Sequence, residues 1–252
     1  MKNLKLISTA CLIIIATTAC YVRQENNNRR TFTMLNTIRV KGNGNIETEE
    51  RNLALFNGIR VSSGINVELK QGENQSVFVQ ADENILQYII TEIKGDVLRI
   101  GIEQNITIVN KSVKLMITMK EIKSLQASSS GNLTGVSPIK ADMLEIRTSS
   151  GGNMDIDVAA NKINVKTSSG GNASLRGNSN VLEVDVSSGG NINASQLEAR
   201  EVNADASSGG NVKIDVTEKL IAKASSGGDI SYIGEPKVVD SRSSSGGTIR
   251  RR

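Results

Sequence analysis

A five-residue segment, Ser-Ser-Gly-Gly-Asn, recurs at a nearly constant spacing and constrains the fold of this chain more than any other feature. Its copies begin at Ser149, Ser168, Ser187, Ser207, Ser225 and Ser244, and the last two carry Asp229 and Thr248 at the fifth position. Degenerate copies begin at Ser62 and Ser128. From Ser128 onward the successive spacings are 21, 19, 19, 20, 18 and 19 residues. A fixed period of about 20 residues predicts a solenoid, in which each repeat stacks on the next.

Apolar and polar residues alternate on both sides of each copy. Three positions before the first Ser stand Ile146, Val165, Val184, Ala204, Ala222 and Ser241. Two positions before the first Ser, the residue is charged: Arg147, Lys166, Asp185, Asp205, Lys223 and Arg242. Alternation with period two predicts strands, and a Gly-Gly pair predicts a corner between them. Equivalent strands would then pair in parallel at about 4.8 Å per coil. The expected fold is all-β, a parallel β-helix or solenoid-like domain with coils of roughly 19–20 residues.

The repeated polar residues have a structural and a functional interpretation. The second Ser of each copy, such as Ser150, is in phase with the apolar rows, so we expect it to point inward, where stacked hydroxyls satisfy one another. The Asn of each copy is expected to form a similar ladder at the corner. The alternative is a metal or sugar site. Calcium-binding β-roll repeats need a Gly-x-Asp spacing that these copies lack, so we expect no metal or cofactor site.

The inner rows become smaller toward the C-terminus. The row three before the Ser runs from Ile146 to Ala222 and Ser241, and the row one before it runs from Thr148 and Val186 to Ala224 and Ser243. Less buried apolar area gives less stabilisation, at about 25 cal/mol per Å². We therefore expect the C-terminal coils to be narrower and to open first.

Charge and composition argue against several classes of function. The net charge is +4 over 252 residues, and Lys2, Lys5 and the run Arg250–Arg252 account for much of the excess. No long basic patch remains, so we expect no nucleic-acid partner. The chain contains no His, which removes the commonest general base and metal ligand. Aromatic residues make up only 2% of the chain, so stacking platforms for sugars are scarce.

The N-terminus has the features of an export signal. Lys2 and Lys5 precede an apolar run that is shorter than a transmembrane helix requires. The run is followed by Thr17-Thr18-Ala19-Cys20. A small residue followed by Cys resembles a bacterial lipobox, although Thr17 stands where that pattern prefers Leu, Val or Ile. We predict a lipoprotein-type signal peptide over residues 1–19 and lipidation of Cys20. The alternatives are ordinary cleavage, which leaves a free Cys20, and an unprocessed anchor.

The rest of the chain divides into a tether and one domain. Residues 20–45 are polar and are expected to form a tether, and residues 46–252 are expected to form a single β-solenoid domain. Within it, Ile85, Tyr88 and Ile89 have helical spacing after Asp82, which predicts a short helix over residues 82–91 that closes one end of the coil. The sequence leaves open whether residues 50–125 continue the same stack.

Several segments together resemble a known family. Val61–Leu69, Asp82–Leu86, Thr91–Ile93 and the later Ser-Gly-Asn repeats resemble the autotransporter-adhesin head GIN domain family over about residues 50–245. Its members are exported bacterial proteins, often lipoproteins, with an all-β repetitive fold. The resemblance implies an exported chain, lipid-anchored to the bacterial envelope at the periplasmic or cell-surface face of the outer membrane. The family brings no established catalytic or binding residues, so none is carried over.

Three functions are weighed on these grounds. The leading one is a non-enzymatic, membrane-tethered envelope protein, an adhesin or interaction scaffold whose partner is a surface polysaccharide or a protein. The second is a self-assembling, filament-forming subunit, because open coil ends and polar ladders can propagate, although Arg250–Arg252 place charge at one end. The third is a polysaccharide-acting enzyme that uses Asp185 and Asp205, although stacked, exposed like charges are typical of a solvated face.

Overall fold

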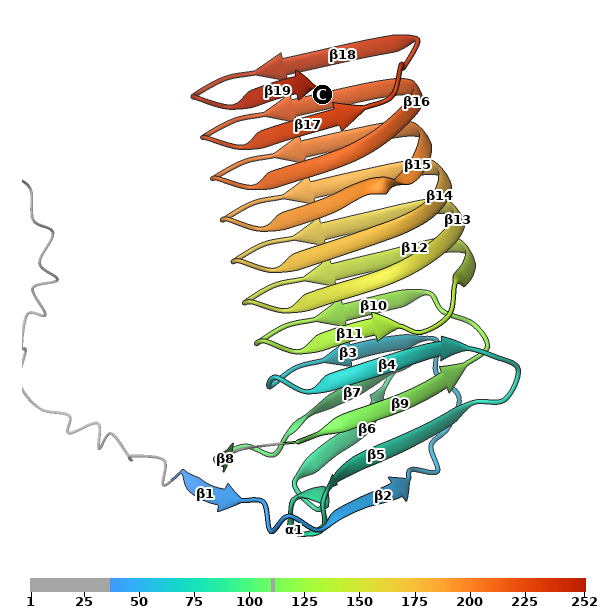
Figure 1. The fold of residues 1–252 in the computed structure, drawn as a ribbon, viewed down its shortest axis with the longest axis vertical. Helices are drawn as coiled ribbons and strands as arrows, with labels where there is room; N and C mark the ends of the chain where they lie inside the picture. The colour runs from blue at the N-terminus through green and yellow to red at the C-terminus, as the bar shows by residue number, and fades with distance from the viewer. Residues whose placement is uncertain (1–36, 110–111) are drawn as a thin grey trace, which may run out of the picture. The chain divides into compact units, whose positions relative to one another are not determined.

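The structure is a computed structural model that describes residues 37–109 and 112–252, which lie within one compact unit (Figure 1). The predicted signal peptide over residues 1–19, the predicted lipidation site Cys20 and most of the predicted tether lie outside the described residues. The predicted tether extends to residue 45, but it overlaps the first described strand, β1 (Ile38–Lys41). This stretch is a strand because it pairs in parallel with β8 (Ile106–Val109), and its Val40 is partly buried against the core.

The unit is a stack of β-coils with an antiparallel cap at its N-terminal end. The cap and the first coils contain β1, β2 (Ile46–Glu50), β3 (Gly58–Val61), β4 (Asn66–Gln71), β5 (Ser76–Asp82), α1 (Glu83–Leu86), β6 (Ile89–Lys94), β7 (Val97–Ile102), β8 (Ile106–Val109) and β9 (Lys114–Met119). The regular coils contain β10 (Ser124–Ala127), β11 (Asn132–Gly135), β12 (Ile139–Thr148), β13 (Asn153–Thr167), β14 (Asn172–Val186), β15 (Asn191–Ala206), β16 (Asn211–Ala224), β17 (Asp229–Ile233), β18 (Val238–Ser243) and β19 (Thr248–Arg251). The predicted all-β solenoid is confirmed.

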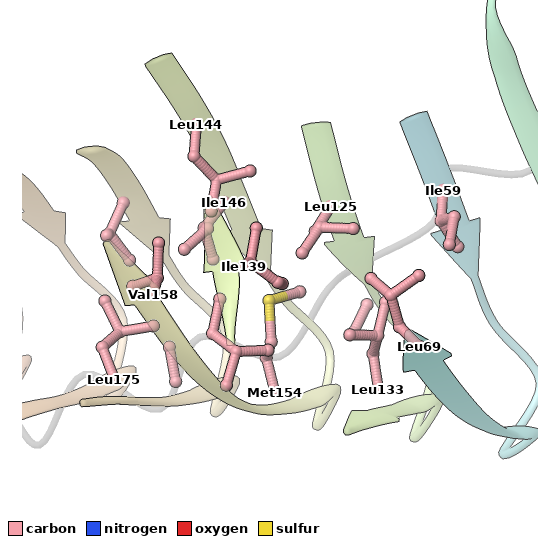
Figure 2. Packing of buried hydrophobic residues seen from close by; sticks show 14 of the residues in the cluster. Ile59, Leu69, Leu125, Leu133, Ile139, Leu144, Ile146, Met154, Val158 and Leu175 are labelled. Carbon is pink, nitrogen blue, oxygen red and sulfur yellow. The ribbon is translucent and has the colours of Figure 1, made fainter. Parts of the chain in front are cut away.

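Each long strand supplies both faces of the flattened coil. β13 leaves one turn at Asn153, runs along one face, bends near Asn161 and returns along the other face to Thr167. It pairs in parallel with β14 one repeat on, Asn153 with Asn172 and Thr167 with Val186. The two faces enclose the core. Figure 2 shows side chains from one face, such as Leu125 and Ile146, directed toward side chains from the other, such as Leu133 and Met154.

The Ser-Ser-Gly-Gly segments form tight turns that line one edge of the stack (Figure 1). In the turn that begins at Ser149, the N–H of Gly152 donates to the Ser149 carbonyl at 2.8 Å. The two central residues have positive φ, 49° at Ser150 and 72° at Gly151, as a type I′ turn requires. The prediction that the second Ser points inward is therefore wrong, because the turn interrupts the strand alternation and leaves Ser150 exposed.

Two of the buried hydroxyls belong to residues directly before a turn, and the others, Ser179 and Ser231, lie elsewhere in the coils. Thr148 and Thr167 are each 2% exposed, and the Thr148 hydroxyl donates to the Thr167 hydroxyl at 3.0 Å. The predicted Asn ladder is confirmed at the corner. From Asn132 to Asn191, each side-chain Nδ2 donates to the Oδ1 of the Asn on the preceding coil at 2.8–3.0 Å, through Asn66, Asn132, Asn153, Asn172 and Asn191.

The N-terminal half joins the same stack, but not in chain order. β3 and β4, joined by the degenerate turn at Ser62, form a coil between two others. On one side β3 pairs with β7 and β4 with β9; on the other side β3 pairs with β10 and β4 with β11. The chain therefore places one coil, builds the cap, and returns to continue the stack. This answers the question that the sequence left open for residues 50–125.

The predicted helix over residues 82–91 is confirmed only as a single turn, α1. Ile89 begins β6, which pairs antiparallel with β7, so its side chain is buried from a strand rather than a helix. Asp82 does not cap α1 with its side chain; its carboxylate accepts the N–H of Gly44 at 2.6 Å. The end of the stack is closed chiefly by antiparallel strands, with β5 on β9 and β2 on β5.

The two glycines of each turn meet different requirements, which can be tested in one turn. Gly170 has a φ of +71°, with open space around its Cα, so Gly170→Ala should lower the free energy of unfolding by about 1 kcal/mol through backbone strain. A Cβ on Gly171 would lie 2.7 Å from the Thr148 carbonyl carbon, so Gly171→Ala should cost about 3 kcal/mol. Urea unfolding of both variants checks this. Equal losses would contradict a steric origin.

The expected weakness of the C-terminal coils can be tested by hydrogen exchange. All six residues of β18 are exposed, and Val239, in an apolar row, is 47% exposed, whereas its neighbour Leu220 is fully buried. We expect the amides of β18 and β19 to exchange before those of β13 and β14, because they lose least buried area on opening. Equal protection across these strands would show that the stack opens as one cooperative unit.

Candidate functional site

The face formed by the strand segments that lead into the turns, here called the pre-turn face, carries one continuous row of outward side chains. It is built from β7, β3, β10, the C-terminal parts of β12–β16, and β18. Pairing along the stack aligns one residue from each of these strands in the central row, in the order Arg99, Arg60, Gln126, Arg147, Lys166, Asp185, Asp205, Lys223 and Arg242. Residues far apart in the chain thus become neighbours about 4.8 Å apart.

A groove of about 500 Å³ lies between the central row and the turns, and we call it the Ser groove. Its charged and amide lining consists of Arg60, Gln126, Arg147, Lys166 and Asp185. Its hydroxyls come from the first Ser of successive turns, namely Ser128, Ser149, Ser168 and Ser187. Because the lining residues come from five successive coils, the groove runs along the stack axis rather than across it.

The cations of the Ser groove are weakly paired. Arg147 lies 3.6 Å from Glu145, and Lys166 lies 3.5 Å from Asp185. Arg60 donates from Nε to Gln126 at 2.8 Å and makes no ion pair with any described residue. Closer pairs occur elsewhere on the stack: Arg99 lies 2.7 Å from Glu92, and Arg176 bridges Asp155 and Asp157, which raise its pKa.

A second groove, of about 350 Å³, continues the pre-turn face on the side away from the turns. It shares Arg147, Lys166 and Asp185 with the Ser groove and adds carboxylates and amides: Glu145, Glu183, Asp205, Asn164 and Asn203. The structure brings the predicted pair Asp185 and Asp205 together as register neighbours. Both side chains are exposed, and Asp185 is paired with Lys166, so the geometry is that of a solvated charged surface.

A different carboxylate pair, which the sequence analysis missed, is electrostatically perturbed. Asp215 of β16 lies beside Glu198 of β15, where the register between the two strands shifts. Burial raises the pKa of Asp215, and the negative charge of Glu198 raises it further. No repeat signal marks this pair, because the shifted register lies in the irregular 20-residue repeat between Ser187 and Ser207.

The raised pKa of Asp215 predicts a pH-dependent effect on stability. A carboxyl whose pKa is higher in the folded state favours folding when protonated, and that contribution is lost as pH rises through the folded pKa. Asp215→Asn should therefore raise the melting temperature at neutral pH, and the gain should disappear as pH falls below the ordinary Asp value of 3.8. Thermal melts across this range measure it, with the exposed Asp142→Asn as control. An unchanged melting temperature at neutral pH would contradict the assignment.

The described residues show neither a metal cluster nor a membrane-spanning helix. Residues 37–109 and 112–252 contain no cluster of three or more His, Cys, Asp or Glu side chains that could hold a metal ion. In the same ranges, no helix is long and apolar enough to cross a membrane.

Comparison with known proteins supports the fold and places the chain in a family. A crystal structure of a putative adhesin from Bacteroides fragilis matches with a TM-score of 0.79 and 23% identity, covering 84% of this chain and 100% of that one. A putative lipid binding protein from Parabacteroides distasonis gives 0.73 and 23% over 85% and 100% of the two chains. A putative adhesin from Parabacteroides merdae gives 0.69 and 23% over 85% and 99%. At these identities the likeness establishes the fold.

No curated protein matches the chain. A family model described as "Putative auto-transporter adhesin, head GIN domain" matches residues 55–236. This range includes Val61–Leu69, Asp82–Leu86, Thr91–Ile93 and the repeats from Ser128 to Asp229, and it is well over half of the chain; the last repeat, at Ser244, lies beyond it. The protein therefore belongs to the auto-transporter adhesin head GIN domain family.

Proposed function

We propose that this protein is a non-enzymatic scaffold of the bacterial envelope, anchored by a lipid on Cys20, that presents its pre-turn face to a surface polysaccharide or protein. The observation that carries the proposal is the continuous grooved row on that face. Outward side chains from separate coils are held in register by a buried core, so the face is preorganised for an extended partner.

The family supports an adhesin-like role and a location outside the cytoplasm. The sequence adds an export signal, the Cys20 that follows it and a polar segment between Cys20 and the first strand. Together these features support a domain tethered to the membrane.

Several observations favour binding over catalysis. Asp185 and Asp205 are exposed, and the perturbed carboxyl Asp215 does not line either groove of the pre-turn face. General acid–base chemistry on a glycoside needs two carboxyl groups that flank one bond of the substrate. The arrangement therefore supports recognition by charge and hydrogen bonding.

The anchor is tested with wild-type protein and Cys20→Ala, expressed with the complete signal sequence in a lipoprotein-processing bacterium. Wild type should carry the mass of acyl chains and enter the detergent phase, and Cys20→Ala should be unmodified and remain in the aqueous phase, because two or more acyl chains give stable membrane binding. Cys11→Ala is the matched control and should behave as wild type. Protease added to intact cells then reports which face of the envelope carries the domain.

If wild type and Cys20→Ala are both soluble and unmodified, the anchor is wrong and the self-assembling alternative gains support. The exposed strand β18 at the C-terminal end of the stack favours that alternative, because an exposed strand edge can pair with another chain. Protease protection of the domain in intact cells, with an acylated Cys20, would leave the anchor in place and move the scaffold role to the periplasm.

A further inference from the structure

We propose that the Ser groove is a binding site for a linear acidic polysaccharide, which lies along the stack axis with its anionic groups on Arg60, Arg147 and Lys166. The role of this binding in attachment rests on the proposed function, whereas the binding itself does not.

The three cations of the Ser groove, Arg60, Arg147 and Lys166, are only weakly paired. The guanidinium of Arg60 has only the amide of Gln126 as a side-chain partner among the described residues, and it donates only from Nε. The Arg147–Glu145 and Lys166–Asp185 separations, 3.6 and 3.5 Å, are longer than charge-assisted hydrogen bonds. A carboxylate or sulfate entering the groove can therefore bind these groups without first breaking a close ion pair.

The other wall of the groove carries a row of Ser hydroxyls. The hydroxyls of Ser128, Ser149, Ser168 and Ser187 are half-buried and make no side-chain hydrogen bond to any described residue. Each hydroxyl can donate and accept, as the hydroxyls of a sugar require. One wall thus offers positive charge and the other offers a row of neutral hydrogen-bonding groups, which matches a chain whose units carry both acidic groups and hydroxyls.

The direction follows from the register. Arg60 and Arg147 are two coil steps apart, about 10 Å, and Lys166 is one step further, about 5 Å. A single small anion can contact one of these groups, or Arg147 and Lys166 together, whereas an extended polyanion contacts all three. Avidity from several weak contacts on one chain then replaces a single tight pocket.

The central row also limits where a polyanion can lie. After Lys166 the row continues with Asp185 and Asp205, which repel an anionic chain, and positive charge returns only at Lys223 and Arg242. The ligand is therefore confined to the N-terminal part of the row. A single-stranded nucleic acid is disfavoured because the lining of the Ser groove includes no aromatic residue on which bases could stack.

The row supplies its own control variant. Arg60→Gln/Arg147→Gln removes two charges from the Ser groove. Lys223→Gln/Arg242→Gln removes the same charge from the same row outside the groove, where Arg242 lies 3.6 Å from Asp240, as Arg147 does from Glu145. Both variants have equal net charge, so a difference between them reports the place of the charge. Circular dichroism and melting temperature check that both remain folded.

Binding of the full-length chain, in detergent, is measured by biolayer interferometry on immobilised polygalacturonate, dextran sulfate, neutral dextran and single-stranded DNA. We expect wild type to bind one or both acidic polysaccharides in a salt-sensitive way and to bind neutral dextran weakly. Arg60→Gln/Arg147→Gln should weaken binding at least about fivefold, and the control variant by less than about twofold. The first two ligands separate carboxylate from sulfate recognition.

Several outcomes would overturn the proposal. Equal weakening in both variants would mean attraction by net charge alone. Tighter binding to DNA than to either polysaccharide, or equal binding to neutral dextran, would identify a different ligand class. No binding to any acidic chain would remove the site, and it would leave the envelope scaffold standing if Cys20→Ala still loses its membrane partitioning. If binding depends on the groove but the domain is found only inside the cell, the polysaccharide site stands and the envelope scaffold is wrong.

Discussion

The close stacking of parallel coils is the constraint on which the rest of this structure depends. Every turn must reverse the chain within four residues while its backbone lies against the backbone of the preceding coil. The first requirement puts two successive residues at positive φ, such as Ser150 and Gly151. The second excludes a side chain at the position that follows, Gly152 in this turn and Gly171 in the next. A Cβ on Gly171, for example, would meet the Thr148 backbone. The repeated Ser-Gly-Gly therefore reflects a steric requirement that recurs in the turns beginning at Ser149 through Ser244, whereas the degenerate turn at Ser62 has Ile65 at the corresponding position.

Once the turns are fixed, the coil spacing determines what each row can contain. Inward rows are mainly apolar, and Thr148 and Thr167 satisfy their hydroxyls by pairing across adjacent coils, whereas the buried hydroxyl of Ser179 has no partner among the described residues. An exposed row at the corner can pair along the stack, as the Asn ladder does. The two ends solve the problem of unpaired strand edges differently. The N-terminal end turns to antiparallel pairing in β5 and β6, whereas β18 at the other end stays exposed.

The sequence predicts the coil well, because local alternation and a fixed period both depend on residues close together in the chain. It fails where the outcome depends on geometry or on distant pairing. Ser150 follows the inward phase in sequence, but the type I′ turn shifts that phase. Ile85, Tyr88 and Ile89 have helical spacing, yet pairing with β7 makes Ile89 a strand residue. The Ser groove could not be predicted, since Arg60 is placed beside Gln126, and in line with Arg147, only by a return of the chain across 66 residues.

The division of each repeat into inward and outward positions explains how a regular scaffold can carry a specific surface. Inward positions are restricted by stacking, so substitutions there disturb the packing of adjacent coils. Outward positions such as Arg147 and Lys166 are partly exposed and weakly paired, so exchanging them costs little stability. Recognition and folding therefore depend on different rows of the same repeat. The pattern of charge along the central row can change coil by coil while the turns, the core and the Asn ladder keep each side chain at a fixed step from the next.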